Sequence, residues 1–461
     1  MNSSRPVTPS RREILRSCAT GLPLIGLYSL LAAEANADTP SDSALSPKSP
    51  PLPARAKSVI FLFMGGGPSQ IDLFDPKPLV ARYKQIPIAL PKVTRDATKN
   101  CLPSPYEFSR HGDSDIEITE LFPHLSAHAD DLCVIRSMVC DHVEHSGALR
   151  QVLTGDGFFP RPSIGSWVLY GLGSESENLP GFVFLGEQYN APGNQLYGSR
   201  FLPTVYDGTA IPNARAPVAN LELRVPRSVQ ANKLALLRQI NERYRRGREE
   251  DSRLDARIAS YELAFRMQTA APEAFDVSAE SAATQQMYGL GVELTDDYGR
   301  KCLLARRLVE RGVRFIVANT NNNWDHHADL REHEKSTAGV DQPIAALLHD
   351  LKLRGLLDQT LVVWGGEFGR TPTAQGAQGR DHHPYGFTMW VAGGGVKRGI
   401  TYGATDDFGF FATENRVHVH DLHATILHLL GLDHKNLTYR FSGRDFRLTD
   451  VHGEVVHDLL A

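Results

Sequence analysis

Residue types that bind metal ions gather in two polar segments that follow apolar runs. In one segment, Asp325 and His327 lie two residues apart, a spacing at which both side chains can face one ion in a loop. The other contains Asp381, His382 and His383 directly before an apolar run, and the alternative for it is a surface loop. Carboxylate and imidazole together suit Zn²⁺ or Mn²⁺ better than Ca²⁺, which prefers oxygen ligands. The two segments predict a divalent metal site.

A third group of candidates follows the apolar run Thr360–Trp364. Glu367 stands where a carboxylate at a strand end would reach a metal ion. Arg370 is expected to hold an anionic group of the substrate through paired hydrogen bonds, and Arg380 is a second candidate for substrate binding. The alternative is that Glu367 and Arg370 form an ion pair that stabilises the turn.

Gly65–Gly67 follow the first apolar run, and their backbone amides could approach an anion. Asp72 and Asp75, a few residues later, are further candidate metal ligands. The alternative is a tight turn in which Asp75, which precedes a proline, only helps to form the loop.

His145 and Ser146 stand at an expected helix start, where Ser146 could be a nucleophile aided by the helix N-terminus, or His145 a general base. Arg150 follows as a candidate for substrate binding. In the alternative interpretation Ser146 is only a helix N-cap. A helix-capping or packing role is favoured for four later histidines, His418, His420, His423 and His428.

The elements that must position these side chains are buried strands. Continuous apolar runs bounded by turn residues are typical of strands in a parallel sheet, and helical patterns such as Asp297–Arg311 lie between them. This alternation predicts an α/β fold with a mainly parallel sheet, in which ligands bind at the carboxyl ends of the strands. The expected strands are Val59–Met64, Gly181–Leu185, Val313–Ala318, Thr360–Trp364 and Phe387–Ala392.

The charge-rich stretch 226–287 has helical periodicity and no strand pattern, which predicts a helical insertion in one domain spanning 57–461. Its arginine run, Arg243–Arg248, is expected to be a solvated helix face. The net charge of −4 and the lack of a clustered basic surface argue against a nucleic-acid partner.

The N-terminus has the order of an export signal. Arg11-Arg12 precede a modestly apolar stretch, and Ala35-Asn36-Ala37 form a small-residue cleavage site. The sequence therefore predicts a twin-arginine signal peptide over 1–37 and a flexible leader over 38–56. The protein would cross folded through the twin-arginine translocase, with its metal already bound, to a periplasmic or secreted location. The apolar stretch is too short for a stable membrane span, and none is expected in the mature protein.

In chain order, these segments resemble those of the alkaline phosphatase superfamily, which includes sulfatases and phosphomutases. The segment Gly365–Gly369 is similar to the superfamily's Asp-His-Gly after a strand. Arg380–His383 resembles the segment with its last metal histidine, which places His382 at the ligand position. Asp325 and His327 resemble the superfamily's middle Asp…His pair. The resemblance implies a mainly parallel sheet sandwiched by helices.

More closely, nearly the whole mature chain resembles exported sulfatase-like proteins grouped as domain of unknown function 1501, abundant in planctomycete bacteria. The segments Phe74–Pro78, Arg161–Trp167 and Gly366–Pro372 carry this similarity, and 437–453 adds to it. Relative to well-understood sulfatases, His145 replaces the nucleophile. Phe368 stands in the place of a metal histidine.

Together these features predict a metal-dependent hydrolase of phosphate or sulfate esters, acting on a small molecule or a sulfated polysaccharide. Asp325, His327, Glu367 and His382 would hold the metal. His145 would act as general base or nucleophile. The rival interpretation is an exported binding or scaffold protein that keeps the fold without turnover, which the missing nucleophile favours.

Overall fold

The computed structural model describes residues 44–87, 99–187, 192–216, 226–245, 261–263, 265–267, 271–321 and 323–461. The predicted signal peptide 1–37 lies outside these residues, as do residues 38–43 of the predicted leader and residues 246–260, 264 and 268–270 of the predicted insertion. Helix α6, which spans Arg227–Arg245, lies in the stretch predicted to be the insertion. In the part of the chain that is described, we find no helix of the length and apolarity needed to cross a membrane.

A nine-stranded sheet forms the core, in the order β12-β4-β11-β8-β1-β7-β5-β6, and β15 also pairs with β4. Strand β1 is parallel to β7 and β8, whereas β11 is antiparallel to β8 and β4. All five predicted apolar runs are strands of this sheet, and the predicted α/β class is confirmed. The strands are β1 Ser58–Phe63, β4 Leu132–Val139, β5 Phe182–Leu185, β6 Thr209–Ile211, β7 Phe315–Asn319, β8 Thr360–Gly365, β11 Phe387–Gly393, β12 Ile400–Tyr402 and β15 Val417–His418.

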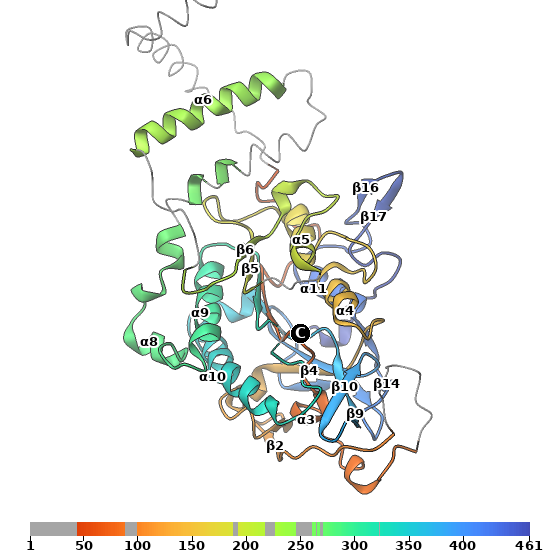
Figure 1. Ribbon diagram of the computed structural model, residues 1–461. Coiled ribbons are helices and arrows are strands. Elements are labelled where there is room, and N and C mark those ends of the chain that lie inside the picture. Colours follow the sequence, from red (N-terminus) through yellow and green to blue (C-terminus); the bar gives the residue numbers. More distant parts are fainter. Residues whose placement is uncertain are drawn as a thin grey trace, which may run out of the picture. The chain divides into compact units, whose positions relative to one another are not determined.

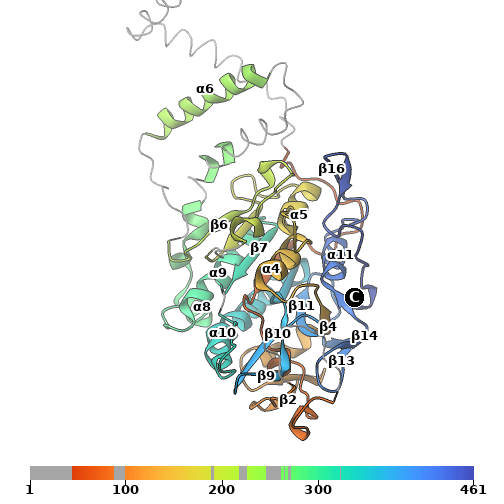
Figure 2. The same ribbon diagram turned by 45° about the vertical axis from the view of Figure 1, so that its right-hand side comes forward.

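Helices cover both faces of the sheet (Figures 1 and 2). Alternate side chains of β1 point to opposite faces, so that Phe61 packs with one helical layer and Leu62 with the other. The layer on the Phe61 side consists of α4 His145–Thr154, α5 Ile164–Leu172 and α11 Val419–Leu429. The layer on the Leu62 side contains α9 Asp296–Glu310 and α10 Glu332–Leu353. Burial on both faces explains why the strands are apolar throughout.

Short elements extend from this core. The most important for the site is an antiparallel hairpin of β9 (Gly369–Gln375) and β10 (Gly379–His383), which follows the end of β8. The sequence predicted a loop at Gly379–His383, and the structure shows a strand. The other described hairpins and short helices are β2 Phe108–His111 with β3 Ile116–Thr119, β13 Ala404–Thr405 with β14 Ala412–Glu414, β16 Tyr439–Phe441 with β17 Arg444–Phe446, α3 Gln70–Leu73 and α8 Ala282–Met287.

Candidate metal centre

The carboxyl ends of β1, β7 and β8 are neighbours in the sheet, and the segments that follow them meet at one edge. Gly66, after β1, has a φ of +112°, which favours glycine. A Cβ atom there would lie 2.5 Å from the backbone nitrogen of Asp325, which follows β7. Only glycine therefore lets the loop after β7 pass so close to the end of β1, and this contact sets the position of Asp325.

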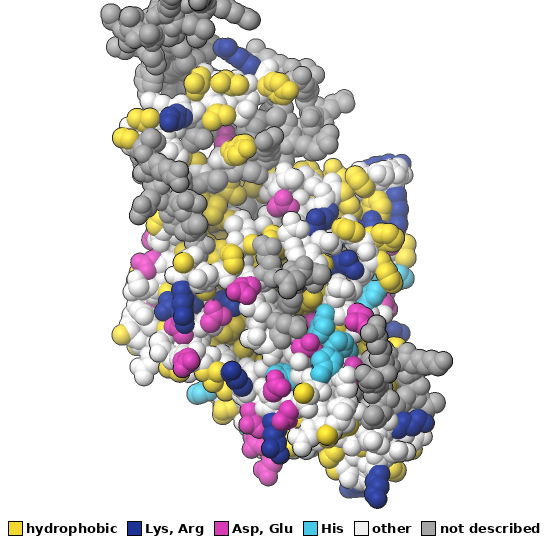
Figure 3. Space-filling view, viewed as in Figure 1, with side chains coloured by type: hydrophobic (Ala, Val, Ile, Leu, Met, Phe, Trp, Pro, Cys, Tyr) yellow, Lys and Arg dark blue, Asp and Glu magenta, His cyan; other side chains and the backbone are white. Residues whose placement is uncertain are grey.

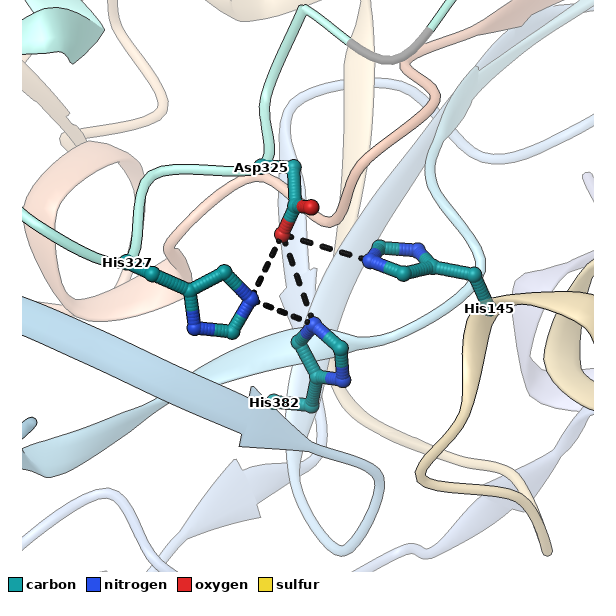
Figure 4. Close-up of side chains that lie close together, drawn as sticks. All are labelled: His145, Asp325, His327 and His382. Carbon is teal, nitrogen blue, oxygen red and sulfur yellow. Dashed lines mark hydrogen bonds and ion pairs between the residues drawn. The ribbon is translucent and has the colours of Figure 1, made fainter. Parts of the chain in front are cut away.

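Four side chains converge at this edge: His145, Asp325, His327 and His382 (Figure 4). One potential ligand atom of each lies within 4.8 Å of the others. The Oδ1 atom of Asp325 is 3.2 Å from His145 Nε2, 2.9 Å from His327 Nε2 and 3.4 Å from His382 Nε2. Three imidazoles thus direct Nε2 at one carboxylate oxygen. They come from the start of α4, the loop after β7 and strand β10.

Each imidazole is held from behind through its Nδ1 atom. His145 Nδ1 lies 2.7 Å from the carboxylate of Glu367, and His382 Nδ1 lies 2.7 Å from the carbonyl oxygen of Val143. His327 Nδ1 contacts the side-chain oxygen of Gln375. An acceptor at Nδ1 places the proton of a neutral imidazole there and leaves the Nε2 lone pair free, as in histidines that bind metals.

The electrostatics of the cluster favour a positive charge between the side chains. Burial lowers the pKa of His145, but its hydrogen bonds and charge interactions with Asp325 and Glu367 outweigh burial and raise this pKa to about 9. For Asp325, burial raises the pKa, and hydrogen bonds from the three histidines together with the charge of Arg370 lower it well below its usual range. Asp325 is therefore ionised, and His145 carries a second proton that a bound metal ion would replace.

Arg370 lies beneath Asp325 and is fully buried. Its Nη2 atom donates to Asp325 Oδ1 at 2.7 Å, and its other N–H groups donate to backbone carbonyls, including those of Gly66 and Gly67. The expectation that Arg370 binds a substrate anion is therefore corrected, because its donors are already engaged. Arg370 positions Asp325 and the glycine turn.

Phe368 packs against two of the imidazoles. Its ring centroid is 4.4 Å from that of His382, with the planes 29° apart, and 5.0 Å from that of His145. The side chain of Phe368 is fully buried. An apolar ring at this place restricts the rotation of both imidazoles and supplies no ligand atom.

Two acidic candidates do not join the cluster. Asp72 is fully buried and accepts hydrogen bonds from Arg380 Nε at 2.7 Å and from Arg380 Nη2 at 3.0 Å. This pairing also removes Arg380 from the candidates for substrate binding, since its guanidinium is buried. Asp75 forms an ion pair with Lys77 at 3.0 Å and accepts a hydrogen bond from Thr405. Both carboxylates thus have protein partners in place of a metal ion.

Glu367 and His383 are also placed differently from the prediction. Glu367 is fully buried and accepts hydrogen bonds from His145 and from the backbone amide of Gly66, so it supports a ligand instead of acting as one. His383 follows His382 on β10, and successive side chains of a strand point to opposite faces. Its Nε2 atom contacts the carbonyl oxygen of Phe410, and burial lowers its pKa to about 4.

The remaining candidates lie on the first two turns of α4. Ser146 follows His145, and its hydroxyl has no hydrogen bond to any described residue. The Nε atom of Arg150 is buried and likewise has no hydrogen-bond partner within the described ranges. Residues four apart on a helix share a face, so Ser146 and Arg150 lie on the same side of α4 as each other.

Comparison with known protein families identifies one family whose model matches this chain. The model of the family described as "Protein of unknown function (DUF1501)" matches residues 56–460. A search of curated proteins finds no match. Solved structures with similarity include a protein in the alkaline phosphatase superfamily from Vibrio parahaemolyticus, with a TM-score of 0.39 and 9% identity, covering 89% of this chain and 75% of that one. They also include the PsFucS1 sulfatase from Pseudoalteromonas, with a TM-score of 0.34 and 11% identity, covering 83% and 68%.

Proposed function

This chain belongs to the DUF1501 family, and we propose that it is an exported, metal-dependent hydrolase of phosphate or sulfate esters. The observation that carries the proposal is the convergence of three imidazole Nε2 atoms and one carboxylate oxygen at the carboxyl edge of the sheet. The basic N-terminal segment with its small-residue cleavage site supports export to the periplasm or beyond. A sulfated polysaccharide is one candidate substrate.

The donor set fits a divalent transition-metal ion. Tetrahedral ligation with bonds of 2.0–2.1 Å separates neighbouring ligand atoms by about 3.3 Å. The separations between Asp325 Oδ1 and the three Nε2 atoms are 3.2, 2.9 and 3.4 Å, which are close to this value. In addition, His145 Nε2 is buried and has no well-aligned hydrogen-bond partner among the described residues. Three nitrogen donors and one oxygen donor suit Zn²⁺ or Mn²⁺ better than Ca²⁺.

The charges at the centre favour an anionic ester. A divalent ion among the three imidazoles would offset the negative charges of Asp325 and Glu367 and would itself attract an anionic ester oxygen. The ion would polarise the ester and lower the pKa of water. His327 is 36% exposed, so the centre is open to solvent and to a substrate on this side.

The residues of α4 would complete the site. Because Glu367 holds His145 at Nδ1 and Nε2 faces Asp325, we assign His145 as a metal ligand in place of the general base or nucleophile that the sequence suggested. The helix N-terminus, the Ser146 hydroxyl and the Arg150 guanidinium would bind the ester oxygens. A covalent step through Ser146 is the alternative that the variants below test.

The proposal is tested by metal content and turnover measured on the same samples. The protein, folded in the cytosol, is analysed for metals and then supplied with Zn²⁺ or Mn²⁺ in an assay of aryl sulfates and aryl phosphates. The His145→Ala variant is expected to lose the metal and the activity together. The Ser146→Ala and Arg150→Gln variants are expected to keep the metal and lose turnover.

His142→Ala is the matched control, since His142 lies three residues before His145 and contacts Phe158 instead of the centre. It should keep the metal. Substoichiometric metal and no turnover after supplementation would overturn the hydrolase proposal. Stoichiometric metal without turnover of any ester would favour the rival function, an exported binding protein.

A further inference from the structure

A polar cavity of about 590 Å³ lies apart from the four candidate ligands. It is formed by Asp141 shortly after β4, by Arg416 and the start of α11, and by the turn 451–454. Its volume is within the range of about 300–1,000 Å³ that is typical of sites for small organic ligands. Histidine and acidic side chains gather on the face of the molecule in Figure 3. The polar side chains that line the cavity are Asp141, Arg416, His418, His420, Asp421, His452 and Glu454.

Three of these side chains already bind other groups of the protein. His418 Nε2 donates to Asp141 Oδ2 at 3.1 Å, and His420 Nε2 donates to the carbonyl oxygen of Gly155 at 2.9 Å. Glu454 forms an ion pair with Lys435 at 3.1 Å. These groups form a fixed wall whose hydrogen bonds a ligand does not need to replace.

Three groups keep free hydrogen-bonding capacity. Arg416 is exposed and makes no ion pair with a described residue. His452 only stacks its ring on His420, with centroids 5.2 Å apart and planes at 1°. Asp141 uses Oδ2 for its side-chain hydrogen bonds and leaves Oδ1. The cavity thus offers a cationic donor, an imidazole and a carboxylate acceptor. Hydroxyl groups, which both donate and accept, match such a mixture.

The charge of the cavity differs from that of the metal centre. Asp141, Asp421 and Glu454 line it with Arg416 as the one permanent cation among the described lining residues. Hydrogen bonds from His418 and Gln151 outweigh burial and lower the pKa of Asp141, so this carboxylate stays ionised. A sulfate or phosphate group is therefore repelled from the cavity and attracted to the centre.

The short chain segment between Asp141 and His145 limits the distance from this wall of the cavity to the centre. Asp141 precedes His145 by four residues, so their Cα atoms are at most about 14 Å apart. The segment between them also contacts the centre, because Val143 accepts the hydrogen bond from His382. A molecule of two linked rings spans such a distance.

We propose that this cavity binds a neutral, hydroxyl-rich part of the substrate's alcohol, such as an unsulfated sugar ring, while the ester group lies at the metal centre. This inference rests on the proposed function for the role of the centre, but binding to the cavity does not require turnover. It adds a restriction to the substrate class: the ring that occupies the cavity carries no anionic substituent.

Ligand binding tests the inference directly on the full-length protein. Saturation-transfer NMR with cellobiose, a neutral disaccharide, is expected to show binding. The Arg416→Gln and His452→Ala variants should each weaken this binding about tenfold, because each removes hydrogen bonds to hydroxyl groups. Arg110→Gln, an exposed arginine on β2, is the control and should bind as the wild type does.

Two competitors identify the ligand class. Choline tests for a cationic ligand and inorganic sulfate for an anionic one, and neither should displace cellobiose. The inference is overturned when the wild type does not bind cellobiose, when both variants bind it unchanged, or when choline or sulfate displaces it. If cellobiose binds as expected but no ester is hydrolysed, the proposed function fails and the inferred cavity ligand stands.

Discussion

Replacing Glu367 with glutamine tests whether this carboxylate supports His145 or itself binds the metal. Glu367 is fully buried, and its oxygens accept hydrogen bonds from His145 Nδ1 at 2.7 Å and from the amide of Gly66 at 3.0 and 3.1 Å. Glutamine has the same shape but only one acceptor oxygen and no charge. It can satisfy one of the two donors, and its NH₂ group then faces the other.

We expect Glu367→Gln to bind the metal ion more weakly than the wild type does. Removing an acceptor that orients a metal-binding histidine weakens affinity by about 10–100-fold. This factor corresponds to about 1.4–2.8 kcal/mol, since each tenfold step costs about 1.4 kcal/mol. The metal should still bind, because Glu367→Gln leaves all four candidate ligands in the protein.

The assay is a competition titration of the metal-free protein with Zn²⁺ and a chromophoric chelator. Gln375→Met is a second variant that does not change a buried charge. It removes the acceptor of His327 Nδ1 and should weaken affinity by about tenfold. Wild-type affinity in both folded variants would refute the reasoning, whereas complete loss of binding in Glu367→Gln alone would make Glu367 a ligand.

Three further predictions concern buried ionisable side chains. Arg370→Lys keeps the charge but cannot reproduce the set of hydrogen bonds to Asp325 and the backbone, so chelator competition should show at least about tenfold weaker metal binding. Arg380→Met leaves the buried carboxylate of Asp72 without its cationic partner and should lower the free energy of unfolding by about 3–5 kcal/mol in urea titrations, whereas adding Asp72→Leu should recover much of it. Burial lowers the pKa of His423 to about 3, so the unfolded chain takes up this proton first and stability falls as the pH drops below about 6.5. Between pH 7.5 and pH 5 the loss from this group is about 2 kcal/mol, and equal losses in the wild type and His423→Gln would contradict it.

The sequence was sufficient to predict the main strands and two of the segments at the centre. Runs such as Thr360–Trp364 are apolar throughout because both faces of the sheet are covered, and this pattern is readable without a structure. Strand β4 was missed. It contains Arg136 and Ser137, which interrupt the apolar run. The segments with Asp325 and His382 were found because both follow or adjoin strong strand patterns.

The roles of the site residues depended on contacts that sequence spacing does not encode. His145 and Glu367 lie 222 positions apart, and only the folded sheet brings them together. The sequence showed charged residues at strand ends. Whether Arg370 faces a substrate or backbone carbonyls was decided by the way the β9–β10 hairpin turns back over the glycine loop. Val143 contributes through a backbone oxygen, which no residue type reveals.

The buried ion pair of Asp72 and Arg380 explains why neither residue joins the metal centre or faces a substrate. Asp72 lies in α3 just after the glycine turn, and Arg380 lies on β10 two residues before His382. The pair therefore fixes the hairpin that carries one ligand to the loop that follows β1. A buried pair contributes little net stability over an apolar one, but it penalises any register in which either charge lacks its partner. The Asp72→Leu/Arg380→Met protein should then recover stability without recovering wild-type metal affinity, because His382 is no longer held in a single register.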